Sequence, residues 1–275
     1  MSTGRLPAYA RRMFELMEPI CTVAFSAPEP DRELVALGLR DDYWDGYFAG
    51  RAAALGEAPA EVVDAAFYSF APGEVARHIP RVWTVTSPVE AAQARLRGCA
   101  AALRRLLDGE RLDEQIDAAG QLATVAARSA SVSGRALFAG LRAQPAPDDP
   151  AARLWHGCNM LREHRGDGHL ASLLAHGIRR SEAHVMLAID AGLPASRFGR
   201  LHHLPEAYVA GVVDDLRRRG LVISESEFTP RGRQIKDSIE RLTDELAVEP
   251  YSSLAEGQRS DLDTALESIS AALAR

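Results

Sequence analysis

The stretch LREHRGDGHL, residues 161–170, gathers side chains that could bind an anion or exchange protons. Its ionisable residues are Arg162, Glu163, His164, Arg165, Asp167 and His169. Arginine binds carboxylates and phosphates through paired hydrogen bonds, and a carboxylate beside a histidine can act as a general acid and base. Glu182 and His184 add two further ionisable groups shortly afterwards. The density of these groups favours a site for an anionic ligand.

The same stretch also fits a purely structural interpretation. Apolar spacing predicts a helix over residues 152–164 that ends at Gly166 and Gly168, with Asp167 capping a second helix over residues 169–176. The charges would then solvate a corner between two helices. We predict no metal, because His164 and His169 are five positions apart instead of four on one helix face, although Asp167 could complete a three-ligand set. We also predict no cofactor.

Aromatic residues gather in the first half of the chain. Residues 43–56 (YWDGYFAGRAAALG) and 67–75 (FYSFAPGEV) hold seven of its 17 aromatic residues. They either pack a core or form the walls of a pocket, and Arg51 lies one helical turn from Tyr47. We predict that a small molecule binds between the two halves, with these residues as ligand-binding groups: Arg51, Tyr47, Phe67, Phe70, Arg162, Glu163, His164, Asp167 and His169.

Helical periodicity predicts a mostly α fold made of two helical halves in tandem. Helices are expected over residues 9–25 and 88–107, the latter capped by Ser87 with Glu90 three positions later. Residues 143–150 (AQPAPDDP) contain three prolines, which exclude regular helix. We therefore expect a helical domain over residues 1–142, a linker over 143–150 and a second domain over 151–275.

Composition limits the class of protein. The chain has 275 residues, 47% hydrophobic and 25% charged, which is typical of a globular protein. Cys21, Cys99 and Cys158 form no closely spaced pair, so the sequence predicts neither a disulfide framework nor a thiolate zinc site. No apolar run approaches the ~20 residues of a membrane span, and the N-terminus does not resemble a secretion signal. We expect a soluble cytoplasmic protein.

The second half carries the pattern of a winged helix. Residues 204–222 (LPEAYVAGVVDDLRRRGLV) predict an amphipathic helix that ends at Gly220. Two short extended runs follow in ISESEFT, and Thr229 can cap a further helix that begins at Pro230. The order of helix, tight hairpin and helix indicates a winged helix with a short two-stranded wing.

Two resemblances support this interpretation. Within residues 195–248, the segments DDLRRRGLVIS and FTPRGRQIKDSIERLTDEL resemble MarR-type winged-helix regulators. The whole chain resembles an actinobacterial family of winged-helix proteins of poorly defined function, through GYFAGRAAALG, FYSFAPGEVARHIP and LREHRGDGH. The regulator resemblance implies a recognition helix over residues 207–219, a wing over 223–228 and DNA contacts from Arg217, Arg218 and Arg219.

The charges of this half depart from the regulator pattern. The net charge of the chain is −6, the recognition helix carries Asp214 and Asp215, and the wing carries Glu225 and Glu227. Acidic groups repel phosphates, so three functions stay open. The first is a DNA-binding transcriptional regulator that responds to a small molecule. The second is a winged-helix derivative that has lost DNA binding and binds or transforms a small anionic molecule. The third is a protein-interaction scaffold.

Catalysis and oligomeric state are open at this stage. The sequence contains neither a phosphate-binding loop nor a nucleophile elbow, and it does not decide whether the protein is an enzyme. The terminal amphipathic helix over residues 260–273 could serve a homodimer or cover the core of its own chain.

Overall fold

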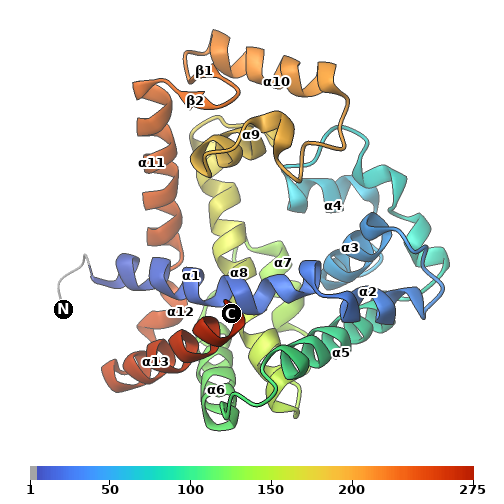
Figure 1. The fold of residues 1–275 in the computed structure, drawn as a ribbon, viewed down its shortest axis with the longest axis vertical. Coiled ribbons are helices and arrows are strands. Elements are labelled where there is room, and N and C mark those ends of the chain that lie inside the picture. Colours follow the sequence, from blue (N-terminus) through green and yellow to red (C-terminus); the bar gives the residue numbers. More distant parts are fainter. Residues whose placement is uncertain (1–4) are drawn as a thin grey trace. The chain divides into compact units, whose positions relative to one another are not determined.

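A computed structural model describes residues 5–275 and shows a mostly helical chain (Figure 1). The α-helices before the proline-rich stretch are α1 (Arg5–Ser26), α2 (Pro28–Val35), α3 (Tyr43–Ala52), α4 (Ala60–Phe67), α5 (Pro88–Leu106), α6 (Asp113–Ser129) and α7 (Ala136–Arg142). Those after it are α8 (Pro150–Ala175), α9 (Arg180–Asp190), α10 (Glu206–Arg218), α11 (Pro230–Leu246), α12 (Glu249–Ser252) and α13 (Glu256–Leu273). The strands are β1 (Val222–Ser224) and β2 (Glu227–Phe228), and the short 3₁₀ helices are η1 (Ala53–Leu55), η2 (Val75–Arg77), η3 (Arg81–Thr84) and η4 (Ala195–Arg197). The expected mostly α fold with a two-stranded wing is confirmed.

Two compact units make up the chain. Unit 1 comprises residues 1–66, 75–168 and 244–275, and unit 2 comprises residues 67–74 and 169–243. The division falls inside α8, between Gly168 and His169, and inside α11, between Thr243 and Asp244. Residues 143–150 connect α7 to α8 within unit 1. The domain limits expected from the sequence therefore remain a prediction.

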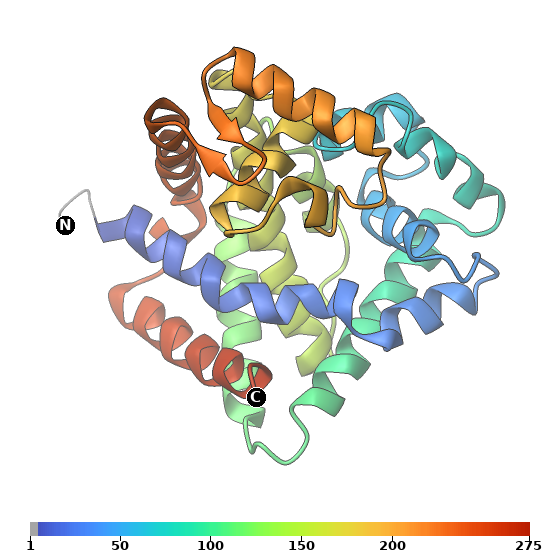
Figure 2. The ribbon, with the colours of Figure 1, turned by 45° about the horizontal axis from the view of Figure 1, so that its top comes forward.

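Unit 1 is a helical assembly around the first two-thirds of α8. Its core contains Met13, Met17 and Ile20 of α1 together with Leu154 and Met160 of α8, all at most 2% exposed. In Figures 1 and 2, α1 crosses α8, and α13 lies beside α1. Burial of large apolar side chains from helices distant in sequence is what stabilises this unit.

Local signals place several of these helices as expected. Ser87 Oγ accepts a hydrogen bond from the backbone N–H of Glu90 at 3.2 Å, while the Glu90 carboxylate accepts one from the Ser87 N–H at 3.1 Å. This capping box starts α5 at Pro88. The terminal helix α13 packs Leu262, Leu266 and Ile269 into the core of unit 1. It therefore covers the core of its own chain, and this apolar face is not available to a second copy.

The expected break at the glycines of LREHRGDGHL is wrong. Helix α8 continues through Gly166 and Gly168 to Ala175. A Cβ atom at Gly168 would lie 2.9 Å from Nη1 of Arg135 and 3.2 Å from Cβ of Leu246. Gly168 thus allows close approach of neighbouring side chains instead of ending the helix. Asp167 does not cap a following helix, since none begins there.

Unit 2 has the winged-helix order α9, α10, β1, β2 and α11 (Figure 2). Strands β1 and β2 pair antiparallel, with Val222 opposite Phe228. Gly220 adopts a left-handed φ of 68° after α10, and Thr229 Oγ1 accepts from the Gly232 N–H at 3.0 Å at the start of α11. The recognition helix and wing expected from the sequence are confirmed as elements.

Part of the aromatic region belongs to unit 2. Residues 67–74 lie against the winged helix, where the Tyr68 hydroxyl donates to the carbonyl of Ile178. Arg180 donates to the carbonyl of Phe70 at 3.4 Å, and His203 Nε2 lies 2.6 Å from Oε1 of Glu74. A short segment from the first half of the sequence therefore completes the second unit.

Candidate functional site

Helix α3 presents Tyr47 and Arg51 one turn apart in unit 1. The Asp42 side chain caps this helix by accepting from the Trp44 N–H at 2.8 Å. Arg51 Nη1 donates to the Tyr47 hydroxyl at 3.2 Å. Spacing along one helix is sufficient to explain this contact, because residues four apart lie on the same face.

Arg51 forms a two-pronged ion pair with Glu163 of α8. Its Nε donates to Oε1 at 3.0 Å and its Nη2 to Oε2 at 2.8 Å. Burial alone would raise the pKa of Glu163, but the adjacent Arg51 lowers it to about 2. Glu163 is therefore a permanent carboxylate at neutral pH, which suits an anchor for arginine and does not suit a general acid.

Arg162 of α8 is paired in the same way with α1. Its Nε donates to Oε2 of Glu18 at 2.6 Å and its Nη2 to Oε1 at 2.9 Å. Its Nη1 lies 3.7 Å from Oε1 of Glu163. The adjacent positions 162 and 163 thus hold two different helices, α1 and α3, against α8.

Arg95 of α5 is a third arginine at this place, and it was not among the site residues predicted from the sequence. It is 5% exposed, and its Cζ lies 5.2 Å from the ring centroid of Phe25 and 5.1 Å from that of Trp155. Its Nη1 donates to the carbonyl of Gly50 at 3.3 Å. A Cβ at Gly50 would approach Cδ of Arg95 to 2.9 Å, so the glycine leaves room for this side chain. We call Arg51, Arg95 and Arg162 the arginine cluster.

A sequence signal for Arg95 does exist. It occupies the face of α5 that otherwise carries Ala91, Ala94, Gly98, Cys99 and Ala102, all of which are buried. An arginine inside such an apolar stripe must be either paired or functional. The pattern could therefore have identified Arg95 as a buried cation, but it could not have named its neighbours.

His164 and Asp167 lie beside α7. His164 is 1% exposed and meets the ring of Phe138 edge-on at 4.9 Å. Burial, and secondarily the charge of Arg135, lowers its pKa to about 3, so the imidazole is neutral. Asp167 Oδ2 accepts from the Phe138 N–H at 3.0 Å. Asp167 therefore caps α7, 29 residues earlier in the chain, instead of a following helix.

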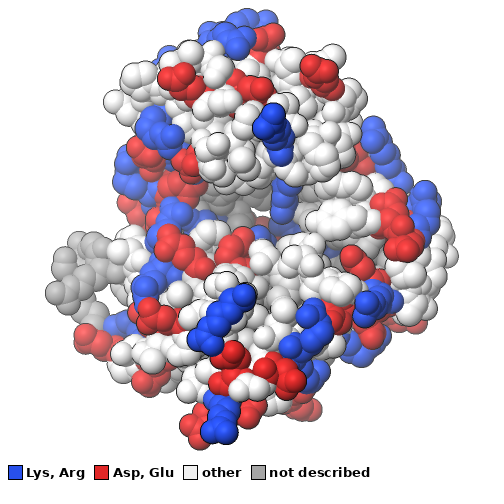
Figure 3. Space-filling model, viewed as in Figure 1, with Lys and Arg blue, Asp and Glu red and all other residues white. Residues whose placement is uncertain are grey.

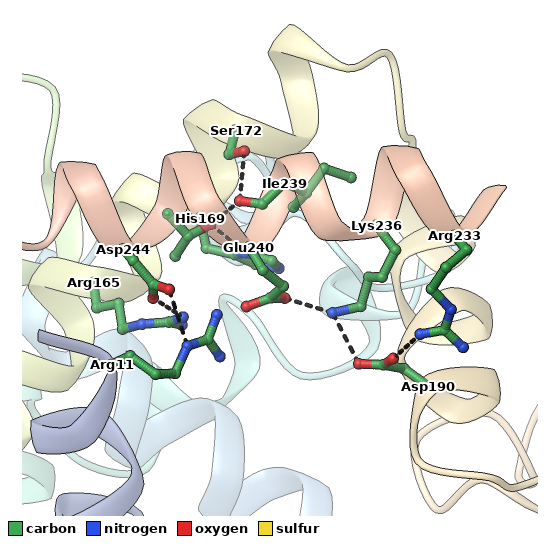
Figure 4. A network of polar contacts seen from close by, with 11 residues as sticks. Arg11, Arg165, His169, Ser172, Asp190, Arg233, Lys236, Ile239, Glu240 and Asp244 are labelled. Atoms are coloured by element: carbon green, nitrogen blue, oxygen red, sulfur yellow. Dashed lines mark hydrogen bonds and ion pairs between the residues drawn. The ribbon is translucent and has the colours of Figure 1, made fainter. Parts of the chain in front are cut away.

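Arg165 is also paired within unit 1. Its Nη2 donates to Oδ1 of Asp244 at 2.9 Å, and Arg11 Nε donates to Oδ2 of the same carboxylate at 3.0 Å (Figure 4). The Arg165 guanidinium also lies 4.1 Å from the ring centroid of Phe14. A protein carboxylate or an aromatic ring contacts every arginine of the LREHRGDGHL stretch.

Phe67, Phe70 and His169 belong to unit 2. The rings of Phe67 and Phe70 are 5.9 Å apart, and Phe70 lies 6.4 Å from the ring of His184. His169 Nδ1 lies 3.0 Å from the Thr243 hydroxyl, which donates to the carbonyl of Ile239 at 2.7 Å. The structure thus brings together Tyr47, Arg51, Arg162 and Glu163, whereas the role of the other predicted ligand residues stays a prediction.

The contacts of α11 in unit 2 are mainly structural. Lys236, the only lysine of the chain, is 6% exposed. Its Nζ lies 2.6 Å from Oε1 of Glu240 and 3.1 Å from Oδ2 of Asp190, and Arg233 pairs with the same Asp190 (Figure 4). Ser172 donates to the Ile239 carbonyl at 3.0 Å. These bonds hold α11 against α8 and α9.

The predicted DNA contacts lie at the C-terminal end of α10. Arg217 pairs with Asp214 and donates from Nε to the Ile223 carbonyl of the wing at 3.1 Å. Arg218 pairs with Asp215, and its side chain is 76% exposed. Arg219 donates to Glu182 at 2.7 Å and to the Gly177 carbonyl at 2.8 Å, so it ties α10 to the start of α9.

A groove of 540 Å³ runs beside α10 and the wing. Leu201, Val209 and Val213 form buried parts of its wall, and three carboxylates lie around it: Glu206, Asp214 and Glu225. Unit 2 as a whole has 11 Lys and Arg against 10 Asp and Glu residues, whereas unit 1 has 21 against 28. Figure 3 shows basic and acidic side chains interspersed on the face in view. Charge therefore gives α10 only weak attraction for phosphate.

The described residues offer neither a metal-binding group nor a membrane-spanning helix. Within residues 5–275, no three His, Cys, Asp or Glu side chains converge as a metal-binding group. None of the helices in this range combines the length and the hydropathy that a bilayer crossing needs.

Comparison with known proteins agrees with the architecture. No curated protein and no solved structure is significantly similar to the chain. A family model described as a helix-turn-helix family matches residues 10–275, which include both units almost entirely. The winged-helix order of unit 2 supplies the helix-turn-helix that this description requires. The chain therefore belongs to this helix-turn-helix family.

Proposed function

We propose that the protein is a winged-helix transcriptional regulator that binds double-stranded DNA through α10 and responds to a small anionic molecule bound in unit 1. The observation that supports DNA binding is the winged helix of unit 2, in a chain that belongs to a helix-turn-helix family. Its recognition helix exposes Ala207, Ala210 and Gly211, followed by Arg218 at the C-terminal end. Small side chains permit close approach to a groove, and the arginine can contact phosphate.

The contacts available to DNA predict modest affinity. We propose Arg217 and Arg218 as phosphate contacts and assign Arg219 to the fold, because its two hydrogen-bond partners lie in unit 2. Two phosphate contacts per chain correspond to a slope of about −1.8 in a plot of log K against log salt, and a homodimer would double it to about −3.6. Residues Ala207, Ala210 and Gly211 offer no side-chain donor to base edges, so we expect sequence preference to depend mainly on DNA shape.

Fluorescence anisotropy with labelled DNA from the upstream region of its own gene tests this proposal. Binding should weaken with salt at one of these slopes, and Arg218→Gln should reduce the slope by about 1 per bound chain. Arg32→Gln removes an exposed arginine of unit 1 and serves as the matched control. Absence of binding even at low salt would exclude the regulator.

One observation favours a second function. Arg217 and Arg218 are each paired with an aspartate of the same helix, and Glu206 and Glu225 lie beside them at the groove. A winged helix with this charge distribution suits a derivative that has lost DNA binding and binds or transforms a small anionic molecule. Ligand binding in unit 1 without DNA binding at any salt concentration would support this alternative over the first.

The arginine cluster supports the small-molecule part of both functions. Tyr47, Arg51, Arg162 and Glu163 were predicted as ligand-binding residues from the sequence, and they meet in unit 1. The side chains of Arg51 and Arg162 are largely buried, with 15% and 17% of their surface exposed. The ligand-binding role of the other predicted residues, Phe67, Phe70, His164, Asp167 and His169, stays a prediction.

A further inference from the structure

The three guanidiniums of the arginine cluster outnumber the carboxylates that pair with them. Two carboxylates, Glu163 and Glu18, form two-pronged pairs with Arg51 and Arg162. No carboxylate of the described residues forms an ion pair with Arg95. Arg95 is therefore the guanidinium of this buried region that has no carboxylate of residues 5–275 within ion-pair distance, although Glu163 also attracts it at longer range.

Neighbouring thiols do not supply that counter-charge. Cys99 lies one turn after Arg95 on α5, and burial raises the pKa of its thiol to about 12 despite the opposing effect of Arg95. Burial likewise raises the pKa of Cys21 well above its ordinary value. Both thiols are neutral at physiological pH, so neither of them offsets the charge of Arg95.

The hydrogen bonds of Arg95 are also incomplete. A guanidinium has five N–H donors, and Arg95 uses Nη1 for the Gly50 carbonyl at 3.3 Å. Its Nη2 is buried and has no hydrogen-bond partner among residues 5–275. The rings of Phe25 and Trp155 attract the cation but offer no acceptor for an N–H group. A buried donor that stays unsatisfied destabilises the fold, and the loss is larger when the donor is charged.

We propose that Arg95 is the anion-binding residue of unit 1 and that its ligand is a small monocarboxylate with an aromatic or aliphatic body. A carboxylate accepts hydrogen bonds in the plane of a guanidinium, which matches the buried Nη2 that lacks an acceptor. One negative charge balances the cluster, whereas a phosphate dianion would exceed it. Phe25, Trp155 and Tyr47 surround the cluster and suit the apolar body of such a ligand. This inference rests on the small-molecule part of the proposed function and is independent of DNA binding.

The test uses the three tryptophans, Trp44, Trp83 and Trp155, which all belong to unit 1. Their fluorescence follows thermal unfolding of the full chain with formate, benzoate or benzamide at constant ionic strength. We expect benzoate or formate to raise the unfolding midpoint by about 3–6 °C at a concentration tenfold above its dissociation constant. Benzamide has the shape of benzoate without its charge and should bind at least about tenfold more weakly.

Arg95→Met should abolish the carboxylate effect, since methionine keeps an apolar stem without the charge. Arg97→Met, an exposed neighbour on α5 that is 56% accessible at its side chain, is the matched control and should retain the effect. Failure of both carboxylates to stabilise the unaltered protein would overturn the proposal, as would equal effects of benzoate and benzamide. An equal effect of benzoate on Arg95→Met would do the same. The benzamide comparison needs no variant, so the proposal remains testable if Arg95→Met does not fold, and none of these outcomes depends on DNA.

Discussion

Replacement of Glu163 by glutamine should destabilise unit 1 strongly and in a pH-dependent way. Glu163 is 2% exposed and accepts two hydrogen bonds from Arg51. Removing one partner of a buried ion pair typically costs about 3–5 kcal/mol, because the remaining charge is left without compensation. The glutamine can still accept one bond from Arg51, so we expect a loss near the lower end of this range.

The pKa of Glu163 gives a second route to the same magnitude. It lies at about 2, roughly 2.5 units below the ordinary value, and each unit corresponds to about 1.4 kcal/mol, so the carboxylate contributes about 3 kcal/mol to folding. Because the pKa is lower in the folded state, this stabilisation is complete above about pH 5 and is lost as pH falls towards 2. At pH 3.5, about half of it should already be gone.

Urea denaturation followed by tryptophan fluorescence measures this effect, since all three tryptophans report on unit 1. The difference in unfolding free energy between the unaltered protein and Glu163→Gln should be about 3 kcal/mol at pH 7 and about half of that at pH 3.5. Glu15→Gln, at an exposed position of α1, should change it by less than about 0.5 kcal/mol.

Two results would refute the reasoning. A difference below about 1 kcal/mol at pH 7 would mean that the pair contributes little more than a surface salt bridge. A large difference that does not change between pH 7 and pH 3.5 would mean that the loss arises from packing and not from the carboxylate charge.

Three further predictions concern other parts of the molecule. Gly232→Ala should destabilise unit 2 by about 2–3 kcal/mol in circular dichroism melts, because its Cβ would lie 1.8 Å from the Leu221 carbonyl oxygen. The control Gly211→Ala, at an exposed position of α10, should be neutral or stabilising. Burial raises the pKa of Asp167 to about 6, so the protein loses stability as pH rises through 6 and this carboxyl ionises. The stability of Asp167→Asn relative to the unaltered protein should therefore increase by about 2 kcal/mol between pH 4 and pH 7. No such increase would show that the pKa of Asp167 is not raised. Arg219→Ala should lower the melting temperature of unit 2 while Arg218→Ala should not, and equal effects would contradict the structural role of Arg219.

Much of the winged helix was predictable from local signals. Gly220 is the residue that ends α10, and Thr229 is the one that caps α11, as their types and positions indicated. The capping box of α5 was predicted in the same way. Such signals act within one helical turn, so the chain encodes them in residues three or four positions apart.

The course of α8 was not predictable in this manner. Each glycine in a helix costs about 1 kcal/mol relative to alanine, which favours a break at residues 166–168. Packing overrides that cost, because α8 is buried along most of its length in unit 1 and Gly168 admits Arg135 at a distance that a Cβ would obstruct. Only the tertiary structure shows that Gly168 makes room for the Arg135 side chain.

The sequence by itself determined which residue types could form a site and on which helices they lie. It did not determine their partners: Arg51 meets Glu163 across 112 positions, and Asp167 reaches back 29 positions to the N–H of Phe138. Among the described residues, Arg95 has no ion-pair partner because the fold pairs Glu163 and Glu18 with other arginines. Charge balance in a buried region depends on which side chains the fold brings within hydrogen-bond distance, and that distance is set by packing between helices far apart in the chain.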